Sequence, residues 1–475
     1  MSNLGDLVSE ACARYRTRTA LVDAEESLGY DALLTSADDI ARELRALGVS
    51  SDEPVLVAIS NRARDVAGLL GVWRAGAVAI PVHRASVDAT VSALLERTAA
   101  RFVVNARADL PAPAALRGAS PVARLDSPAP ARRALLEGAA LVVFTSGSTG
   151  IPKGVVLAHE PYTAKLEMID RVARFEERER VLLVLQLTFS YGQWVALLTL
   201  LRGGTVYAHE RFRADAARAT LLQHELTRTA IVPTMARALL QLPPDPEVPA
   251  FAGMVHCGGE TLPASLGRGL RRLWPAAALW DGYGLTETNT CDFFLPAEEY
   301  DEGAGTIGGP APGIAYRIAE PDGELQIKTP TIMRGYLDDP DQTAAAFDDG
   351  WFRTGDLAEL RSDGRVALKG RAKEIINRAG NKVSPLEVEA VFLEHPDVDA
   401  ALAAGARDEE RGEAIHLCVV PRSGVEPDLA SLRVWARERL DHYKLPDYLH
   451  LSAELPLGPT GKADRRALRR MIESG

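Results

Sequence analysis

TSGSTGIPKG, residues 145 to 154, is the segment that decides the fold of this chain. It lies between two apolar runs, ALVVF and GVVLAH, that are typical of buried strands. Its small and hydroxylated residues, followed by Lys153, offer backbone amides, hydroxyl groups and one cation to a polyphosphate. The segment therefore predicts a phosphate-binding loop, with a flexible Gly/Ser hairpin as the alternative.

Two other catalytic loops do not fit this segment. A Walker A loop needs Ser or Thr after the Lys and then a helix, whereas Lys153 is followed by Gly154 and an extended VVLAH run. Neither Ser146 nor Ser148 lies in the GxSxG pattern of a nucleophile elbow.

Outward from this loop, short apolar runs alternate with helical patterns from about residue 139 to residue 280. This alternation is the βαβ signature of parallel sheets covered by helices, and it begins near the VLVAIS run at Val55. After about Gly303, short Gly- and Pro-rich strands predict a small β-barrel or sheet. The fold class is therefore α/β and α+β, with more than one domain.

The last hundred residues predict a compact α/β unit. Ser384, Pro385 and Glu387 have the pattern of a helix start with a capping box. Strands are expected at 400–405 and 414–420, and a helix at 429–440. We place the domain boundary near Arg371.

Composition narrows the class of protein. The 475 residues include 54 Lys and Arg against 65 Asp and Glu, a formal net charge of −11, so we expect no nucleic-acid partner, with only a local basic patch left open. No run approaches 18 apolar residues and no targeting segment is evident, which favours a cytoplasmic protein without membrane insertion. The four scattered cysteines favour neither a zinc site nor a disulfide framework.

TSGSTGIPKG resembles the phosphate loop of the adenylate-forming superfamily, which includes acyl-CoA synthetases, peptide-synthetase adenylation domains and luciferases. Four further segments resemble this superfamily's motifs in the same order: YGLTE at 283–287, WFRTGDL at 351–357, GRAKEII at 370–376 and GPTGKADR at 458–465. The pattern is most similar to acyl- or aryl-CoA ligases. The resemblance implies a large N-terminal domain, 1–370, and a mobile C-terminal domain, 371–475, with a hinge near Lys373.

The implied reaction converts a carboxylic acid and ATP to acyl-AMP and pyrophosphate, and then transfers the acyl group to coenzyme A. The implied cofactors are ATP, Mg²⁺ and coenzyme A, or a carrier-protein phosphopantetheine in its place. Because this chemistry brings two anions together, the site must neutralise charge with a metal and fixed cations.

The resemblance assigns the catalytic roles to Lys462, Thr286 and Glu287, with Glu287 also holding Mg²⁺. Lys462 would bridge the carboxylate and the α-phosphate; the alternative is an exposed basic residue near a charged tail. Tyr283 would pack against adenine and Asp356 would bind the ribose hydroxyls; a packed ring and a turn-forming Asp are the alternatives. The ATP or AMP site is expected to comprise Thr145, Ser146, Gly147, Ser148, Thr149, Gly150, Lys153, Gly258, Gly259, Glu260, Asp281, Gly282, Tyr283, Gly284, Asp356 and Arg371. Asp281 departs from the family pattern, where many relatives carry Asn.

The thiol step is implied by GNKVSPLEVE, residues 380–389, which resembles the loop that lines a pantetheine tunnel. Gly380 would let the thiol arm pass, or it is a plain turn glycine. By motif register the acyl pocket comprises Phe189, Ser190, Tyr191, Trp194, His256, Gly282, Thr290 and Cys291.

Ser190 occupies the position where amino-acid-activating relatives carry Asp, so an α-amino acid is disfavoured. Tyr191 and Trp194 favour an aryl or short to medium acyl acid over a long fatty chain, unless Trp194 is plain core.

Three alternatives to a CoA ligase stay open on the sequence. They are a stand-alone adenylation enzyme that loads a carrier protein, a luciferase-like oxygenase and an inactive nucleotide-binding module. The expected partners are a small-molecule acid and coenzyme A or an acyl carrier protein, in a monomer or homodimer.

Overall fold

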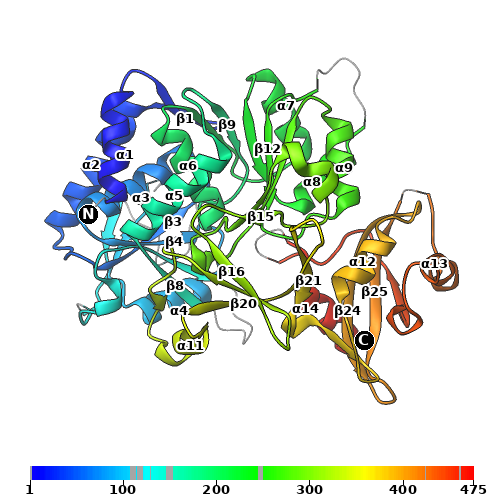
Figure 1. The fold of residues 1–475 in the computed structure, drawn as a ribbon. Helices are drawn as coiled ribbons and strands as arrows, with labels where there is room; N and C mark the ends of the chain where they lie inside the picture. Colours follow the sequence, from blue (N-terminus) through cyan, green and yellow to red (C-terminus); the bar gives the residue numbers. More distant parts are fainter. Residues whose placement is uncertain are drawn as a thin grey trace.

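The structure is a computed structural model that describes residues 3–106, 114, 121–128, 130–145, 153–243, 250–422, 424–458 and 462–474. Four sheets with flanking helices account for most of these residues (Figure 1). The phosphate-loop residues Ser146, Gly147, Ser148, Thr149 and Gly150 lie outside the described ranges. No helix in the described ranges is long and apolar enough to cross a membrane.

Two large sheets form the N-terminal part. The first has the order β18-β8-β7-β4-β3-β5-β6, and the second β15-β14-β13-β12-β11-β9-β10-β1-β2. The strands of the first sheet are β3 (Pro54–Ile59), β4 (Val78–His83), β5 (Phe102–Val104), β6 (Val122–Arg124), β7 (Ala139–Thr145), β8 (Lys153–Ala158) and β18 (Gly335–Tyr336). Those of the second are β1 (Thr19–Val22), β2 (Ser27–Gly29), β9 (Arg180–Leu183), β10 (Thr205–Ala208), β11 (Arg228–Ile231), β12 (Met254–Gly258), β13 (Ala278–Tyr283), β14 (Phe293–Leu295) and β15 (Gly309–Pro310).

The predicted βαβ order is confirmed in the middle of the second sheet, where β1, β10, β9, β11, β12 and β13 run parallel. Its edges differ from that prediction, because β2, β14 and β15 pair antiparallel. The phosphate-loop segment begins at the end of one hairpin strand and ends in the other, with Thr145 of β7 opposite Lys153 of β8.

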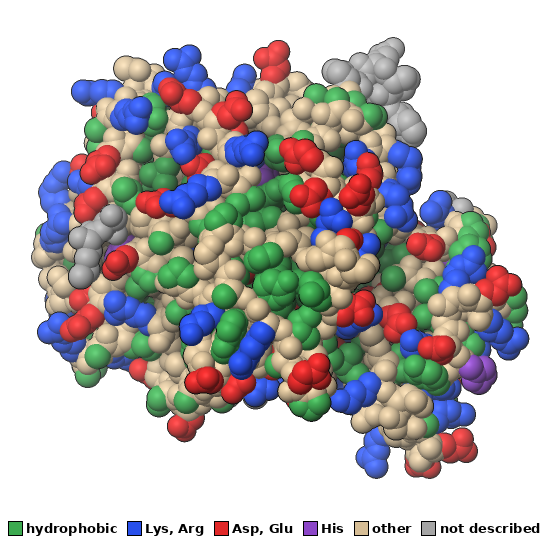
Figure 2. Space-filling view, viewed as in Figure 1, with side chains coloured by type: hydrophobic (Ala, Val, Ile, Leu, Met, Phe, Trp, Pro, Cys, Tyr) green, Lys and Arg blue, Asp and Glu red, His purple; other side chains and the backbone are tan. Residues whose placement is uncertain are grey.

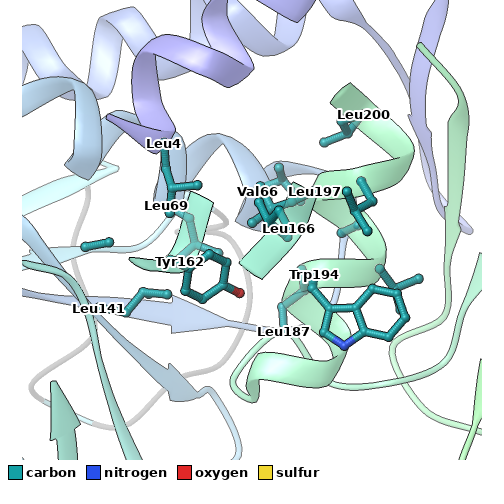
Figure 3. Packing of buried hydrophobic residues seen from close by; sticks show 14 of the residues in the cluster. Leu4, Val66, Leu69, Leu141, Tyr162, Leu166, Leu187, Trp194, Leu197 and Leu200 are labelled. Atoms are coloured by element: carbon teal, nitrogen blue, oxygen red, sulfur yellow. The ribbon is translucent and has the colours of Figure 1, made fainter. Parts of the chain in front are cut away.

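Helices cover both large sheets and bury the main core between them. Their apolar faces meet in one cluster, in which residues of α1, α3, α5 and α6 pack together (Figure 3). The helices of this part are α1 (Leu4–Arg14), α2 (Tyr30–Ala46), α3 (Ala63–Ala75), α4 (Asp88–Thr98), α5 (His159–Ala173), α6 (Ser190–Leu201), α7 (Ala214–Gln223), α8 (Pro233–Leu240), α9 (Ala264–Leu273), α10 (Tyr300–Gly303) and α11 (Pro340–Ala345).

The small β-barrel or sheet expected after Gly303 is present as a five-stranded antiparallel sheet. Its long strand, β20, pairs with strands on both sides and carries the WFRTGDL motif. The strands are β16 (Ala315–Ala319), β17 (Glu324–Lys328), β19 (Phe347–Asp348), β20 (Trp351–Leu360) and β21 (Val366–Arg371).

The C-terminal part has its own sheet and its own apolar cluster. Its elements are β22 (Ile376–Arg378), β23 (Asn381–Val383), α12 (Pro385–Phe392), β24 (Val398–Asp408), β25 (Gly412–Pro421), α13 (Leu429–Ala436), β26 (Tyr448–Leu451) and α14 (Arg465–Ser474).

Two local predictions for this part were wrong in detail. Ser384 caps α12 as predicted, but the Glu387 carboxylate pairs with Lys444 at 2.7 Å instead of completing a capping box. Helix α13 ends at Ala436 rather than Leu440, and the chain continues in a turn in which the Arg439 amide donates to the Ala436 carbonyl, three residues back, at 2.9 Å.

Surface charge and cysteines agree with the composition. On the face in Figure 2, acidic and basic side chains are interspersed rather than gathered into a basic patch. The four cysteines are buried free thiols.

Candidate active site

The candidate site lies at the carboxyl ends of β12 and β13, where open α/β sheets bind their ligands. Gly258 and Gly282 are register partners at these ends. A Cβ atom on Gly258 would lie 2.5 Å from the Gly282 carbonyl oxygen, so the close approach of the two strands requires a glycine here. The segment HCGGE, residues 256–260, and the YGLTE segment therefore emerge side by side.

Asp356 on β20 is the centre of the first group of predicted residues. Tyr283 Oη donates to one carboxylate oxygen at 2.6 Å, and Arg371 Nε lies 2.8 Å from the other. The carboxyl group is buried, and burial raises its pKa from the usual range while Arg371 and Tyr283 oppose this shift. The fold of the protein itself thus brings three residues from separate motifs into contact.

Glu287 is the centre of the second group. Tyr336 Oη donates to its carboxylate at 2.9 Å, and Lys153 Nζ lies 4.6 Å from the centre of the Tyr336 ring. Burial lowers the pKa of Lys153, whereas Glu287 raises it. Tyr336 was not predicted from the sequence. The only sequence feature that marks this residue is the Gly335-Tyr336 pair after an apolar stretch.

Lys462, which belongs to the C-terminal part, reaches the carboxyl ends of β12 and β13. Its ammonium group donates to the Gly259 carbonyl at 2.5 Å, and the next amide, from Ala463, donates to the Glu260 carboxylate at 3.2 Å. Burial lowers the pKa of Lys462, with Glu260 opposing the shift. Gly259 has a φ of +83°, and a Cβ atom there would stand 3.1 Å from Lys462 Nζ, so both conformation and space favour glycine.

We call Tyr283, Glu287, Asp356, Arg371 and Lys462 the polar edge. Their charges lie close enough to affect one another: Arg371 interacts electrostatically with Tyr283, Glu287 and Asp356, and also with Lys462. The structure therefore brings together the five predicted residues of the polar edge.

The loop from Gly284 to Asp292 connects the polar edge to the predicted acyl pocket. Thr286 and Glu287 lie in a single 3-10 turn, and the next three residues, 289–291, all have φ between 52° and 65°. Such left-handed non-glycine residues cost on the order of 1 kcal/mol or more each. Beneath them Lys165 Nζ binds Asp292 at 2.7 Å, in an ion pair that is 1% and 0% exposed. Sequence reasoning missed this pair.

Three of the predicted acyl residues, Tyr191, Trp194 and His256, belong to a group of packed rings, whose other members were not predicted from the sequence. Tyr191 stacks on Trp194 at 5.4 Å between ring centres, and Trp194 meets His256 edge-on at 5.9 Å. Phe175 stacks on His256, and Trp280 stacks on Phe294 while meeting His256 edge-on. We call these six residues the ring wall: Phe175, Tyr191, Trp194, His256, Trp280 and Phe294.

Of the other predicted acyl residues, Gly282 lies against this wall, because a Cβ atom there would lie 3.7 Å from the Trp280 ring. Phe189 precedes the first turn of α6, which begins at Ser190. Thr290 and Cys291 follow on the strained loop, with the Thr290 hydroxyl 3.9 Å from the Cys291 sulfur. Trp194 is 1% exposed within the main core, so the plain-core alternative describes its burial, although its ring also contacts Tyr191 and His256.

Asp281, the departure from the family pattern, is buried at the end of β13. Burial raises its pKa well above the usual range. Burial therefore disfavours the carboxylate form; a protonated carboxyl group would offer one O–H donor, whereas the amide of Asn offers two N–H donors.

Two further predicted residues, Lys373 and Gly380, follow β21 in the C-terminal region. Lys373 lies in a one-turn 3-10 helix after β21, with an exposed side chain, and it lowers the pKa of Lys153 electrostatically. Gly380, with φ of +82°, forms the hairpin turn between β22 and β23 together with Ala379. This geometry is that of a turn glycine.

The residues present fit a bound Mg²⁺. No cluster of three or more metal-ligating side chains occurs within the described ranges. Mg²⁺ in nucleotide sites is commonly held by one or two carboxylates plus phosphate oxygens. The Glu287 carboxylate, oriented by Tyr336 at the polar edge, meets that requirement.

The sequence matches the family model of the AMP-binding enzyme over residues 8–337, and that of the AMP-binding enzyme C-terminal domain over residues 387–462. It is 31% identical to a sulfoacetate–CoA ligase of Cupriavidus necator, over 98% of this chain and 97% of that protein. A feruloyl-CoA synthase of Amycolatopsis is 31% identical over 95% of each chain. The structure of a benzoate CoA ligase from Burkholderia xenovorans LB400 superposes with a TM-score of 0.84, at 26% identity, over 99% of this chain and 100% of that one.

The chain therefore belongs to the AMP-binding enzyme family. It is an AMP-forming acid–CoA ligase, an enzyme that uses ATP, Mg²⁺ and coenzyme A to activate a small-molecule carboxylic acid.

Proposed function

We propose that the protein activates an aryl or short to medium acyl acid at the polar edge, with Lys462 as its catalytic lysine, and passes the acyl group to coenzyme A. The observation that carries this proposal is the contact of Lys462 Nζ with the Gly259 carbonyl. It brings a cation from the C-terminal part to the strand ends where Tyr283, Glu287 and Asp356 gather. This is the arrangement that joining two anions requires.

In the first step the polar edge binds ATP and neutralises charge. Asp356 accepts hydrogen bonds from the ribose hydroxyls, and Tyr283 packs its ring against adenine. Lys462 then lies between the acid carboxylate and the α-phosphate, where its ammonium group stabilises the charge that develops as the acyl–phosphate bond forms and pyrophosphate leaves. Glu287 and Thr286 hold the phosphate end, and bound Mg²⁺ supplies Lewis-acid charge there.

In the second step the C-terminal part, residues 371–475, turns about Lys373 and withdraws Lys462 from the edge. The exposed Lys373 side chain stays solvated in either orientation. The turn at Gly380 would then approach the acyl adenylate and admit the narrow thiol arm.

The identity of the acid is open, and so is a second acceptor in addition to coenzyme A. Coenzyme A is the acceptor named for the curated relatives, and a carrier-protein phosphopantetheine is the alternative. The acids named for these relatives are sulfoacetate and ferulate, and benzoate for the superposed structure. Ser190 provides no anion for an α-ammonium group, which disfavours α-amino acids.

The proposal is tested by pyrophosphate release from ATP and Mg²⁺ with aryl, short, medium and long carboxylic acids, each with and without coenzyme A. We expect release with one group of acids and consumption of free thiol. We expect Lys462→Ala to lower the rate of release about 100- to 1,000-fold, as for removal of one group that stabilises transition-state charge. Lys328→Ala, which removes an exposed lysine of β17, is the matched control and should retain the rate.

Two results would contradict parts of this proposal. An unchanged rate in Lys462→Ala would move the catalytic lysine elsewhere. Adenylate formation without thiol consumption would favour a carrier protein as acceptor.

The proposed compartment is the cytoplasm, because the four cysteines are all free thiols, as in proteins of reducing compartments. The proposed state is a monomer or homodimer, which size-exclusion chromatography with light scattering distinguishes. A secreted protein in cell fractionation, or a larger assembly, would contradict these two points.

A further inference from the structure

Three buried polar atoms of the acyl region have no hydrogen-bond partner among the described residues: Ser190 Oγ, Trp194 Nε1 and His256 Nδ1. Their residues are 3%, 1% and 1% exposed. A buried polar group without a partner costs about 1–3 kcal/mol, and native proteins contain few of them. Three in one place therefore require an explanation.

These atoms belong to one wall. Ser190 and Trp194 are four residues apart at the start of α6, so their side chains lie on one face of the helix. The Trp194 ring meets the His256 ring at 5.9 Å, which joins α6 to β12. Figure 3 shows the Trp194 indole nitrogen on the side of the ring away from Leu197 and Leu200.

Arg228 determines which proton His256 carries. One guanidinium nitrogen of Arg228 contacts His256 Nε2, and a guanidinium can only donate. His256 Nε2 is therefore the acceptor and the proton sits on Nδ1. Consequently His256, like Trp194, presents an N–H donor, and two donors cannot satisfy each other.

Arg228 itself has no hydrogen bond left to give. It donates to Glu179 with two nitrogens, one of these bonds measuring 2.6 Å, and to the carbonyls of Ala173 and Arg174, each at 3.1 Å. Glu179 neutralises its charge. Lys165, the buried cation beneath the strained loop, is likewise paired with Asp292. These two cations leave no net positive charge for an anionic substituent.

We infer that the acid is an aromatic or heteroaromatic one whose ring carries an uncharged hydrogen-bond acceptor, which receives the Trp194 and His256 N–H groups. This inference rests on the proposed function and names its substrate class. A hydroxyl, carbonyl or ring-nitrogen substituent meets the requirement, and the Ser190 hydroxyl can bond to the same group. Flat rings suit this wall because aromatic side chains pack favourably against them, stacked or edge-on.

The test compares kcat/KM of the wild-type enzyme for benzoate with that for its three monohydroxy derivatives, the three pyridine carboxylates and the three benzene dicarboxylates. We expect at least one hydroxy or pyridine acid to exceed benzoate by tenfold or more, because the unsubstituted ring leaves the donors unpaired. The dicarboxylates should not exceed benzoate, since Arg228 and Lys165, the two cations described above, are already paired with Glu179 and Asp292.

Substitutions then identify which side chains recognise the ring substituent. Trp194→Phe removes the N–H and keeps a ring, and we expect the preference over benzoate to fall to about threefold or less, through a higher KM for the preferred acid. Trp274→Phe makes the same change at a buried tryptophan of a different core cluster and should keep the preference. Ser190→Ala should reduce the preference less than Trp194→Phe.

The outcomes separate the two proposals. Benzoate activated as well as every acceptor-bearing acid, or a preference that survives Trp194→Phe unchanged, would overturn this inference while leaving the acid–CoA ligase intact. A preferred dicarboxylate would also overturn it. No pyrophosphate release with any acid would contradict the proposed function itself.

Discussion

The polar edge and the ring wall adjoin the same strand ends, yet they are prepared for ligands in opposite ways. At the polar edge, Asp356 already holds Tyr283 and Arg371, and Glu287 holds Tyr336. On the ring wall, Trp194 and His256 carry buried donors that no described residue accepts.

The difference teaches where selectivity arises. The charged groups that we propose to act on ATP, a substrate common to every turnover, are oriented in advance by their own partners, so little reorganisation is needed when charge develops. Buried groups without a hydrogen-bond partner favour the acid that supplies one. They disfavour all other acids, because the groups then stay unpaired. The edge is therefore suited to catalysis and the wall to choice of acid.

The largest expected effect concerns the ion pair beneath the loop that joins the two regions. Lys165→Met leaves Asp292 as an uncompensated buried charge, and we expect a loss of roughly 3–5 kcal/mol in the free energy of unfolding, measured by urea denaturation. Because the loop carries Thr286 and Glu287 at one end and Thr290 and Cys291 at the other, KM for ATP and KM for the acid should both rise.

A matched control lies on the same helix. Arg171 pairs with Glu167 at 4.0 Å with both side chains largely exposed, so Arg171→Met should change stability by no more than about 0.5 kcal/mol. The double variant Lys165→Met/Asp292→Leu should regain most of the loss. If only one of the two KM values rose in Lys165→Met, the loop would not couple the edge to the wall.

A pair of Tyr→Phe substitutions compares the regions directly. Tyr283→Phe removes a hydrogen bond to a buried carboxylate, worth about 1.5–3 kcal/mol, so we expect kcat/KM for ATP to fall about 10- to 100-fold. Tyr191→Phe removes a 3.2 Å bond to the His256 carbonyl, a neutral acceptor, and should lower kcat/KM for the acid less than about tenfold. Equal losses measured in steady-state kinetics would contradict the distinction drawn here.

The smallest effect concerns an ion pair inside the C-terminal part, between α12 and α14. Glu389 binds Arg465 at 2.9 Å, three residues after Lys462, and burial raises the Glu389 pKa from 4.5 to about 7, with Arg465 opposing. Between these values the folded protein holds a proton that the unfolded chain has released. The stability contributed by this group is therefore full below pH 4.5 and is lost as the pH rises through 7.

We expect Glu389→Gln to remove this decline. The difference in unfolding free energy, variant minus wild type, should increase by about 1 kcal/mol per pH unit from pH 5 to pH 7 in urea titrations. The loss of the ion pair with Arg465 lowers the stability of the variant by a constant amount, so it does not affect the slope of this difference against pH. A difference that stayed constant over this range would show that Glu389 titrates normally.

Local sequence was a good guide wherever a short segment determines its own structure. The Ser384-Pro385 helix start and the hairpin around TSGSTGIPKG follow from capping and strand patterns, which involve neighbours along the chain. The partner of Glu387 was predicted wrongly, because a distant group competes for the same carboxylate, and α13 ends at Ala436 instead of Leu440. Lys444, which takes the Glu387 carboxylate, lies 57 residues away.

The sequence by itself determined the order of the motifs, the family and the residue types that handle charge. Tertiary structure alone decided which of them touch. Tyr336 on Glu287, Lys165 beneath the strained loop and Arg228 behind His256 carry no motif, and their roles arise from contacts between segments 28 to 127 residues apart. Burial also raises the pKa of Asp281 and lowers that of His256, because desolvation depends on what surrounds a group and not on its neighbours in sequence.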